Sequence, residues 1–199
     1  MSEPYLFSVE LLRDRVPAFD QYPFHLSAVR HLTRLSLHPA ITFLVGENGA
    51  GKSTLLEAIA VAAGYNAEGG SRSLQFDTRA SHSELYEYLR LSRGVRRPRD
   101  GFFLRAESYF NVATQIERLD EEDLPAARIG PVYSDRKLHE QSHGESFLAL
   151  FTNRFFGRGL YLLDEPEAAL SPTRQLAVLS RLHQLVEQDS QFIIATHSP

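Results

Sequence analysis

A glycine-rich run with one lysine and two hydroxyl side chains points most directly to chemistry. Its residues, in order, are Gly46, Glu47, Asn48, Gly49, Ala50, Gly51, Lys52, Ser53 and Thr54. Glycines let a backbone curl until successive N–H groups face one concavity, and such a concavity binds anions. The lysine would reach the β- and γ-phosphates of a nucleotide and take part in catalysis, and Ser53 would supply a hydroxyl to Mg²⁺. The run therefore predicts a phosphate-binding loop.

The flanks of this loop argue against the plain alternative, an ordinary glycine-rich turn. Ile41 to Val45 has the β-branched and aromatic content of a buried strand, and Lys52 to Ala63 has helical spacing with Gly64 as its stop. A strand before and a helix after place the loop at a helix N-terminus, where the helix dipole favours anions. The context therefore supports a nucleotide site.

Two adjacent acids follow the apolar run Gly159 to Leu163, which has the composition of a second buried strand. Neighbouring strand residues point to opposite faces, so Asp164 and Glu165 should have different tasks. Asp164 is the candidate metal ligand, through water, because Mg²⁺ keeps several waters and takes one or two carboxylates. Glu165 is the candidate for orienting and deprotonating an attacking water. The alternative is a strand end whose acids simply face solvent.

Three further segments resemble parts of the ABC-type ATPases. The segment Gln141 to Ser146 resembles the ABC signature, Asp164 to Ser171 resembles Walker B with the D-loop, and Ala195 to Ser198 resembles the switch-histidine loop. Their order and spacing also match. Within this type the chain resembles the soluble P-loop ATPases related to RecF and SMC proteins, a group of AAA-family ATPases.

The resemblance implies ATP as the nucleotide and a head-to-tail homodimer with two ATP molecules between the protomers. Ser142 and Gly144 of one protomer, with Glu145 at the start of the helix behind them, would contact the γ-phosphate held by the other protomer. His197 would hydrogen-bond the γ-phosphate and help to place the water. The alternative for His197 is a polar residue that merely ends the buried strand Phe192 to Thr196.

The sequence also departs from the family pattern. His143 replaces the first glycine of the signature pair, and Ser171 stands where the D-loop aspartate is usual. The Q-loop glutamine has no clear counterpart, and the candidates are Glu107, Gln75 and Gln115. The residue that stacks on adenine is open among Phe7, Arg13 and Tyr22. The resemblance further implies strands and helices beyond His197, whereas the given sequence ends two residues later.

These residues need strands and helices to hold them. Short β-branched or aromatic runs alternate with longer helical patterns, which predicts an α/β fold. The resemblance implies a P-loop NTPase fold, with a mixed central sheet flanked by helices. We expect a single domain, residues 1–199, with a core lobe at about 1–70 and 147–199. An inserted, mainly helical lobe with the signature would occupy about 71–146.

Three local patterns add detail to this scheme. Ser81 to Glu84 has capping-box spacing and predicts a helix through about Leu91. Phe102 to Leu104 predicts a strand. Ser171 followed by Pro172 predicts a helix start. The expected inward side chains of that helix are Leu176, Leu179 and Leu182.

An arginine cluster lies in the segment assigned to the inserted lobe. Its members are Arg90, Arg93, Arg96, Arg97, Arg99 and Arg105, and the only acid among them is Asp100. The cluster could contact a nucleic-acid backbone or an acidic protein partner. The alternative is a solvated surface whose arginines pair with the acids at 120–123.

The bulk composition limits the class of protein. The 199 residues are 43% apolar, carry a net charge of −4 and contain no cysteine, which excludes disulfides, thiolate metal sites and cysteine nucleophiles. The N-terminus lacks the layout of a secretory signal, and no apolar run is long enough to span a membrane, so we expect a cytoplasmic protein.

Three functions fit these features. The first is a soluble ABC-type ATPase in DNA maintenance, repair or defence, supported by the D-loop sequence and the arginine cluster. The second is the ATP-binding subunit of a membrane transporter, supported by the transporter-like spacing between the phosphate loop and the signature. The third is an ATP-gated clamp or scaffold with little turnover.

Overall fold

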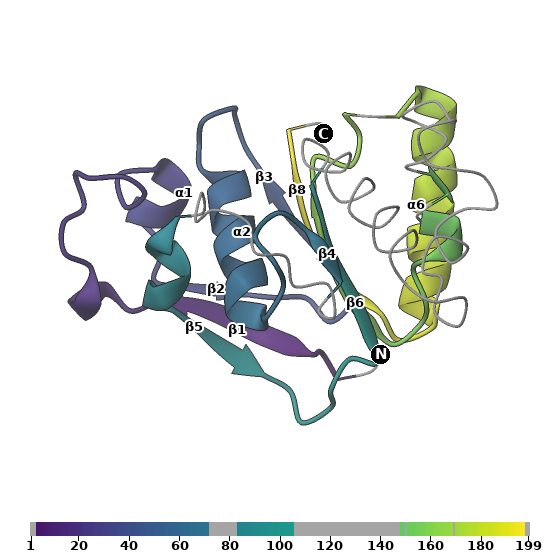
Figure 1. Ribbon diagram of the computed structural model, residues 1–199, viewed down its shortest axis with the longest axis horizontal. Coiled ribbons are helices and arrows are strands. Elements are labelled where there is room, and N and C mark those ends of the chain that lie inside the picture. The colour runs from purple at the N-terminus through teal and green to yellow at the C-terminus, as the bar shows by residue number, and fades with distance from the viewer. Residues whose placement is uncertain (1–2, 72–82, 106–147, 150, 169, 198–199) are drawn as a thin grey trace, which may run out of the picture.

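The computed structural model describes residues 3–71, 83–105, 148–149, 151–168 and 170–197, whose strands form two sheets (Figure 1). The antiparallel sheet consists, in spatial order, of β2 (Arg34–Ser36), β1 (Leu6–Leu11) and β5 (Leu89–Arg93). The larger sheet consists of β3 (Ile41–Val45), β8 (Gln191–Thr196), β7 (Gly159–Asp164), β6 (Asp100–Arg105) and β4 (Gly70–Ser71). Its strands pair in parallel except β4, so the expected mixed sheet of an α/β fold is confirmed.

Helix α2 (Lys52–Ala63) lies between the two sheets (Figure 1). Its Leu56 and Ile59 are fully buried in a core that also contains Val9 of β1 and Leu162 of β7. A left-handed glycine stands at each end of the helix, Gly51 with φ 93° and Gly64 with φ 97°. Glycine adopts this conformation without steric penalty, so the sequence sets both limits of the helix. The short elements are η1 (Arg13–Arg15), α1 (Ser27–Arg30) and η2 (Glu84–Tyr88).

Helix α6 (Pro172–Glu187) covers the other face of the larger sheet (Figure 1) and begins at Ser171 and Pro172, as the sequence predicts. The prediction of its inward side chains is wrong for two of three leucines. Leu182 is buried together with Val178 and Leu185, whereas Leu176 is 65% and Leu179 is 54% exposed. Leucines recur on both sides of this helix, and only the aromatic cluster beneath it, which includes Phe151 and Phe192, selects the buried side.

The helix predicted from Ser81 through about Leu91 is wrong. Ser83 caps a short 3₁₀ helix instead, accepting a hydrogen bond from the Leu85 N–H at 3.1 Å. The chain then enters β5, which pairs with β1 so that Leu89 lies opposite Leu11 and Leu91 opposite Val9. Pairing with a distant strand overrides the local helical spacing, because β1 offers an apolar edge to these leucines.

The position of β5 and β6 also differs from the expected division into lobes. Both strands lie within 83–105, which we assigned to the inserted lobe, yet β5 pairs with β1 and β6 pairs with β7. This stretch therefore belongs to the two sheets of the core. Ser71, the first residue of the expected lobe, ends β4 in the larger sheet. The rest of that lobe, 72–82 and 106–146, lies outside the described residues.

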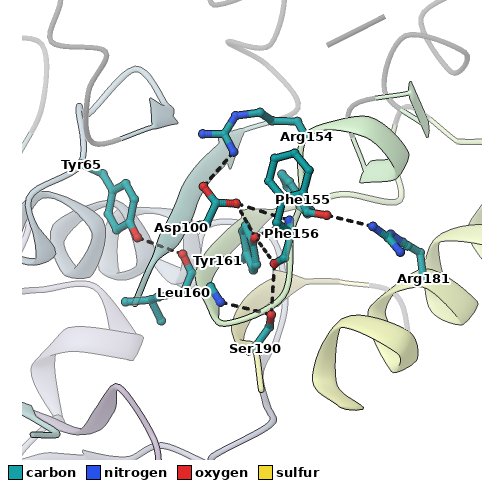
Figure 2. Close-up of polar contacts among 10 residues, drawn as sticks. Tyr65, Asp100, Arg154, Phe155, Phe156, Leu160, Tyr161, Arg181 and Ser190 are labelled. Atoms are coloured by element: carbon teal, nitrogen blue, oxygen red, sulfur yellow. Dashed lines mark hydrogen bonds and ion pairs between the residues drawn. The ribbon is translucent and has the colours of Figure 1, made fainter. Parts of the chain in front are cut away.

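A partly buried polar network joins the amino ends of β6 and β7 (Figure 2). The Tyr161 hydroxyl lies 2.6 Å from Asp100 Oδ2 and accepts a hydrogen bond from the Phe156 N–H at 2.8 Å. Arg154 Nη1 donates to Asp100 Oδ1 at 2.8 Å. Burial, and then the hydrogen bond to Asp100, raise the pKa of Tyr161, so the hydroxyl stays protonated. The network fixes the strand ends that lie away from the phosphate loop.

No helix among the described residues is both long and apolar enough to cross a lipid bilayer.

Candidate functional site

The predicted site residues of the phosphate loop, the acid pair and the switch histidine meet at one edge of the larger sheet. The loop follows β3, the acid pair ends β7, and His197 follows β8. These strands are parallel neighbours in the order β3-β8-β7, so their carboxyl ends lie at the same edge. Ligands of open α/β sheets bind outside the carboxyl ends of the strands.

The phosphate loop turns through two left-handed glycines, Gly49 with φ 79° and Gly51 with φ 93°. Lys52 is only 6% exposed, and its Nζ donates to the carbonyl oxygens of Gly46 at 2.8 Å and Glu47 at 3.0 Å. The ammonium group therefore curls back over the loop from the first turn of α2. The loop thus combines a fixed cation with a helix N-terminus, and both attract phosphate oxygens.

A segment that the sequence did not single out packs directly on this loop. Ala28 N–H donates to the Ala50 carbonyl at 2.9 Å, and Ser27 Oγ donates to the same oxygen at 3.2 Å. A Cβ atom added at Gly51 would lie 2.8 Å from Cβ of Leu26. A side chain at Gly51 would therefore require Leu26 to shift, in addition to straining the left-handed backbone. No motif in the sequence marks Leu26 to Ala28, because their role is to contact a loop more than twenty residues away in the chain.

One of the adenine candidates lies shortly before this segment in the chain. Tyr22 is 61% exposed and precedes the stretch that contacts the loop. Arg13 is engaged elsewhere, since its Nη1 donates to the carbonyl oxygens of Arg30 and Leu32 at 2.9 and 3.0 Å. Phe7 lies on β1 and is 40% exposed. Tyr22 is thus the candidate nearest in sequence to the segment that contacts the phosphate loop.

The two predicted metal ligands touch each other. Ser53 Oγ donates to Asp164 Oδ1 at 2.8 Å, and Asp164 is 6% exposed. The described residues contain no cluster of three ligating acidic, histidine or cysteine side chains. One hydroxyl and one carboxylate beside a phosphate loop nevertheless fit Mg²⁺, which takes its remaining ligands from water and substrate phosphates. The donor set present therefore fits the ion that the sequence predicts.

The second acid of the pair points to another partner. Glu165 has a left-handed backbone, with φ 49°, and its N–H donates to the Ala195 carbonyl at 2.9 Å. His197 Nδ1 lies 3.4 Å from Glu165 Oε1 and 3.9 Å from Glu167 Oε1. The Thr196 hydroxyl donates a short hydrogen bond to Glu167. Side-chain contacts therefore connect the loop after β7 with the end of β8, and Glu165 and His197 face one another.

An arginine that sequence reasoning grouped with the surface cluster lies inside this site. Arg105, the last residue of β6, places Nη1 2.6 Å from Glu57 Oε2 of α2 and Nε 3.7 Å from Asp164 Oδ2. Only the register of β6 beside β7, in which Arg105 lies opposite Asp164, reveals this placement. A basic residue directly after the predicted strand Phe102 to Leu104 was the available signal.

The other arginines of the cluster do not share one site. Arg90 lies 3.6 Å from Glu10, Arg96 lies 3.3 Å from Asp189, and Arg93 donates to the Ala62 carbonyl at 2.8 Å. Arg97 and Arg99 are exposed. The described residues of the cluster therefore engage different parts of the molecule instead of one shared partner.

The remaining predicted site residues lie outside the described residues. They are Ser142, Gly144 and Glu145 of the signature, the Q-loop candidates Gln75, Glu107 and Gln115, and His143. The acids at 120–123, proposed to pair with the arginines, lie outside as well.

Comparison with known proteins places the chain in a family. A family model described as an AAA domain matches residues 20–142. An uncharacterized ABC transporter ATP-binding protein of Haemophilus influenzae is 26% identical over 187 residues, which are 86% of this chain and 69% of that protein. The ABC transporter G family member STR2 of Medicago truncatula is 27% identical over 172 residues. The matched part covers 80% of this chain but 24% of that relative.

Two solved structures also resemble the chain. A putative ABC transporter (ATP-binding protein) from Pyrococcus furiosus has a TM-score of 0.44 at 17% identity, covering 84% of each chain. The SMC head domain from Thermotoga maritima has a TM-score of 0.43 at 16% identity, covering 97% of this chain and 89% of that one. Because the family model spans more than half of the sequence, the protein belongs to the AAA-domain family, as a P-loop ATPase of the ABC type.

Proposed function

We propose that the protein binds ATP and hydrolyses it with Mg²⁺. One observation carries this proposal: a phosphate loop, a Ser53–Asp164 pair at 2.8 Å and a Glu165–His197 pair at 3.4 Å occupy one sheet edge. The first provides the phosphate contacts, the second the metal ligands, and the third a base with a neighbour that orients it. Membership of the AAA-domain family points to the same activity.

Each residue has a task that its position supports. Lys52 would exchange the Gly46 and Glu47 carbonyls for phosphate oxygens, since its Nζ already lies inside the loop. Ser53 and Asp164 would hold Mg²⁺, which neutralises charge on the phosphates when it is bound. Glu165 would accept a proton from the attacking water. His197 would hold that water and the γ-phosphate in line, because it lies beside the Glu165 carboxylate.

The site is proposed to work in an ATP-sandwiched homodimer. Ser142 and Gly144, with Glu145 beside them, would close the nucleotide from a second copy of the chain, which the signature-like sequence supports. The helix after the signature would direct its N-terminal dipole at the γ-phosphate, as α2 does from the other side. ATP and a second copy are thus the proposed partners, and the cytoplasm the proposed location.

Two uses of the activity remain distinct proposals. A soluble ATPase acting in DNA maintenance, repair or defence is supported by the D-loop sequence and by the exposed Arg97 and Arg99. A transporter's ATP-binding subunit is supported by the two curated relatives, both named as ABC transporter proteins. ATP hydrolysis measured with and without duplex DNA, single-stranded DNA and RNA at fixed salt separates them, because a DNA-acting ATPase is stimulated by its substrate.

The ATPase itself is tested by Glu165→Gln. Removing the general base should lower kcat by roughly 10²- to 10⁴-fold, while ATP binding persists because the phosphate loop is intact. The matched control is Glu187→Gln, the same chemical change on an exposed residue of α6. Wild-type protein that binds ATP without turnover would support a clamp or scaffold instead. Equal rates for wild type and Glu165→Gln would contradict the proposed base.

A further inference from the structure

The guanidinium of Arg105 lies between the nucleotide-binding helix and the strand that carries the metal ligand. Nη1 lies 2.6 Å from Glu57 Oε2 on α2, and Nε lies 3.7 Å from Asp164 Oδ2 on β7. The exposed fractions of these side chains are 22% for Arg105, 12% for Glu57 and 8% for Asp164. The three charges are thus largely withdrawn from water, where charged hydrogen bonds are stronger than at a surface.

The two carboxylate oxygens of Asp164 face different neighbours. Oδ1 accepts the hydrogen bond from Ser53 at 2.8 Å, and Oδ2 faces Arg105. A rotation of the carboxylate would break the first contact, so a cation on the Oδ2 side restrains this rotation. The arginine is itself held, because Glu57 accepts from its Nη1 and receives a backbone hydrogen bond from Ser83 N at 3.4 Å.

The Nε–H of Arg105 is buried and has no hydrogen-bond partner in the described part of the chain. Asp164 Oδ2 lies 3.7 Å from this nitrogen, slightly beyond hydrogen-bond distance. A buried donor without a partner destabilises the folded state. A small movement of Asp164 or Arg105 would satisfy this donor and orient the metal ligand at the same time.

We propose that Arg105 is a positioning residue for the Mg²⁺ site: it holds Asp164 Oδ2 so that Oδ1 remains on Ser53, with Glu57 as its anchor. Glu57 also neutralises the arginine, so the pair adds no net positive charge beside the cation. The end of β6 and the middle of α2 are thereby tied to the metal ligand. This inference rests on the proposed ATPase function, because it concerns the Mg²⁺ of that site.

Two variants change the Arg105–Glu57 pair without changing its net charge. Arg105→Lys keeps the positive charge but loses the planar group whose separate N–H groups address Glu57 and Asp164. The double variant Glu57→Gln/Arg105→Gln removes one charge of each sign. The matched control is Arg90→Lys, the same substitution in the exposed Arg90–Glu10 pair, whose side chains are 62% and 42% exposed.

The readout is the dissociation constant of ATP, measured by calorimetry with excess EDTA and again with Mg²⁺. We expect both Arg105 variants to bind ATP in EDTA as the wild type does, because the phosphate loop is intact. The tightening that Mg²⁺ produces should fall about tenfold, the effect of one charge-assisted hydrogen bond. Arg90→Lys should match the wild type in both conditions.

The outcomes separate this inference from the proposed function. If wild-type protein binds ATP no more tightly with Mg²⁺, the proposed function itself is contradicted. If Mg²⁺ tightens binding equally in wild type and both Arg105 variants, only the positioning role is overturned. Weaker binding in EDTA as well as in Mg²⁺ would show that Arg105 supports the fold of α2, and this too would overturn the proposed role.

Discussion

Glu165 shows at the scale of one residue how stability and activity can oppose each other. Its φ of 49° places a non-glycine residue in the left-handed region, next to the strand end that carries Asp164. Such a conformation costs roughly 1–2 kcal/mol for an L-residue with a Cβ atom. The backbone is retained there by the hydrogen bond from the Glu165 N–H to Ala195. The conformation directs the carboxylate to His197 instead of along the strand.

This strain gives a prediction about Glu165→Gly. The variant should be about 1 kcal/mol more stable than the wild type, because glycine relieves the left-handed backbone, and it should have lost ATP hydrolysis. Thermal unfolding and an ATPase assay measure the two effects. Arg158→Gly, which relieves a φ of 61° away from the proposed site, should gain stability and keep activity. A Glu165→Gly protein less stable than wild type would contradict the assignment of strain.

Tyr161 offers a second test at this scale. In Tyr161→Phe, Asp100 and the Phe156 N–H lose a buried partner, and we expect a loss of about 1–3 kcal/mol in the free energy of unfolding. ATP hydrolysis should be unchanged, since the network lies at the amino ends of the strands. Denaturant unfolding and kcat check the two statements. A selective loss of activity without a loss of stability would contradict the structural role.

The same residue predicts a pH dependence. Burial raises the pKa of Tyr161 in the folded protein above its value in the unfolded chain. The stabilisation is therefore fully present below the ordinary tyrosine pKa of about 10 and is lost as the pH rises above it. From about pH 8 to about pH 11 the stability difference between wild type and Tyr161→Phe should shrink. An unchanged difference would show that Tyr161 does not carry this dependence.

At the scale of an element, the phosphate loop depends on the segment packed against it. Gly51→Ala combines a φ of 93° with a Cβ atom 2.8 Å from Leu26 Cβ, whereas Gly49→Ala meets open space at a φ of 79°. Both substitutions strain the backbone by about 1–2 kcal/mol, but only the first also displaces Leu26. Gly51→Ala should therefore weaken ATP binding and stability more than Gly49→Ala, measured by calorimetry and thermal unfolding. Equal effects would show that the Leu26 contact is unimportant.

Helix α6 illustrates the same dependence on neighbours. Its exposed Leu179 borders an apolar groove together with Phe43 and Val45 of β3, the edge strand of the larger sheet. The helical spacing of leucines cannot distinguish this groove from the buried core. The distinction comes from the shape of the sheet beneath the helix.

At the scale of the whole molecule, the proposed dimer predicts complementation between two inactive proteins. Lys52→Ala removes the phosphate contact, and Ser142→Ala removes the signature serine of the opposing protomer. Mixing the two variants forms one intact composite site per heterodimer, so ATP hydrolysis should return. The measurement is specific activity of each variant alone and of an equimolar mixture. No recovery on mixing would contradict a site shared between protomers.

Much of the fold and of the site can be inferred from local sequence. The α/β class follows from the alternation of strand and helix patterns, and the limits of α2 follow from Gly51 and Gly64. The phosphate loop is also a local signal, because its function needs neighbouring backbone N–H groups, one lysine and one hydroxyl in series. The acid pair is recognised in the same way, as adjacent residues ending an apolar strand.

The contacts between residues distant in sequence are decided by the tertiary structure alone. Ser53 meets Asp164 across 111 positions of sequence, and Arg105 reaches Glu57 across 48. Residues 83–93 form a 3₁₀ helix followed by a strand, because the edge of β1 is available for pairing with that strand. Sequence patterns fix what each segment favours by itself. Which residues then touch depends on strand order, register and the face each helix turns inward, and these are set by packing of the whole chain.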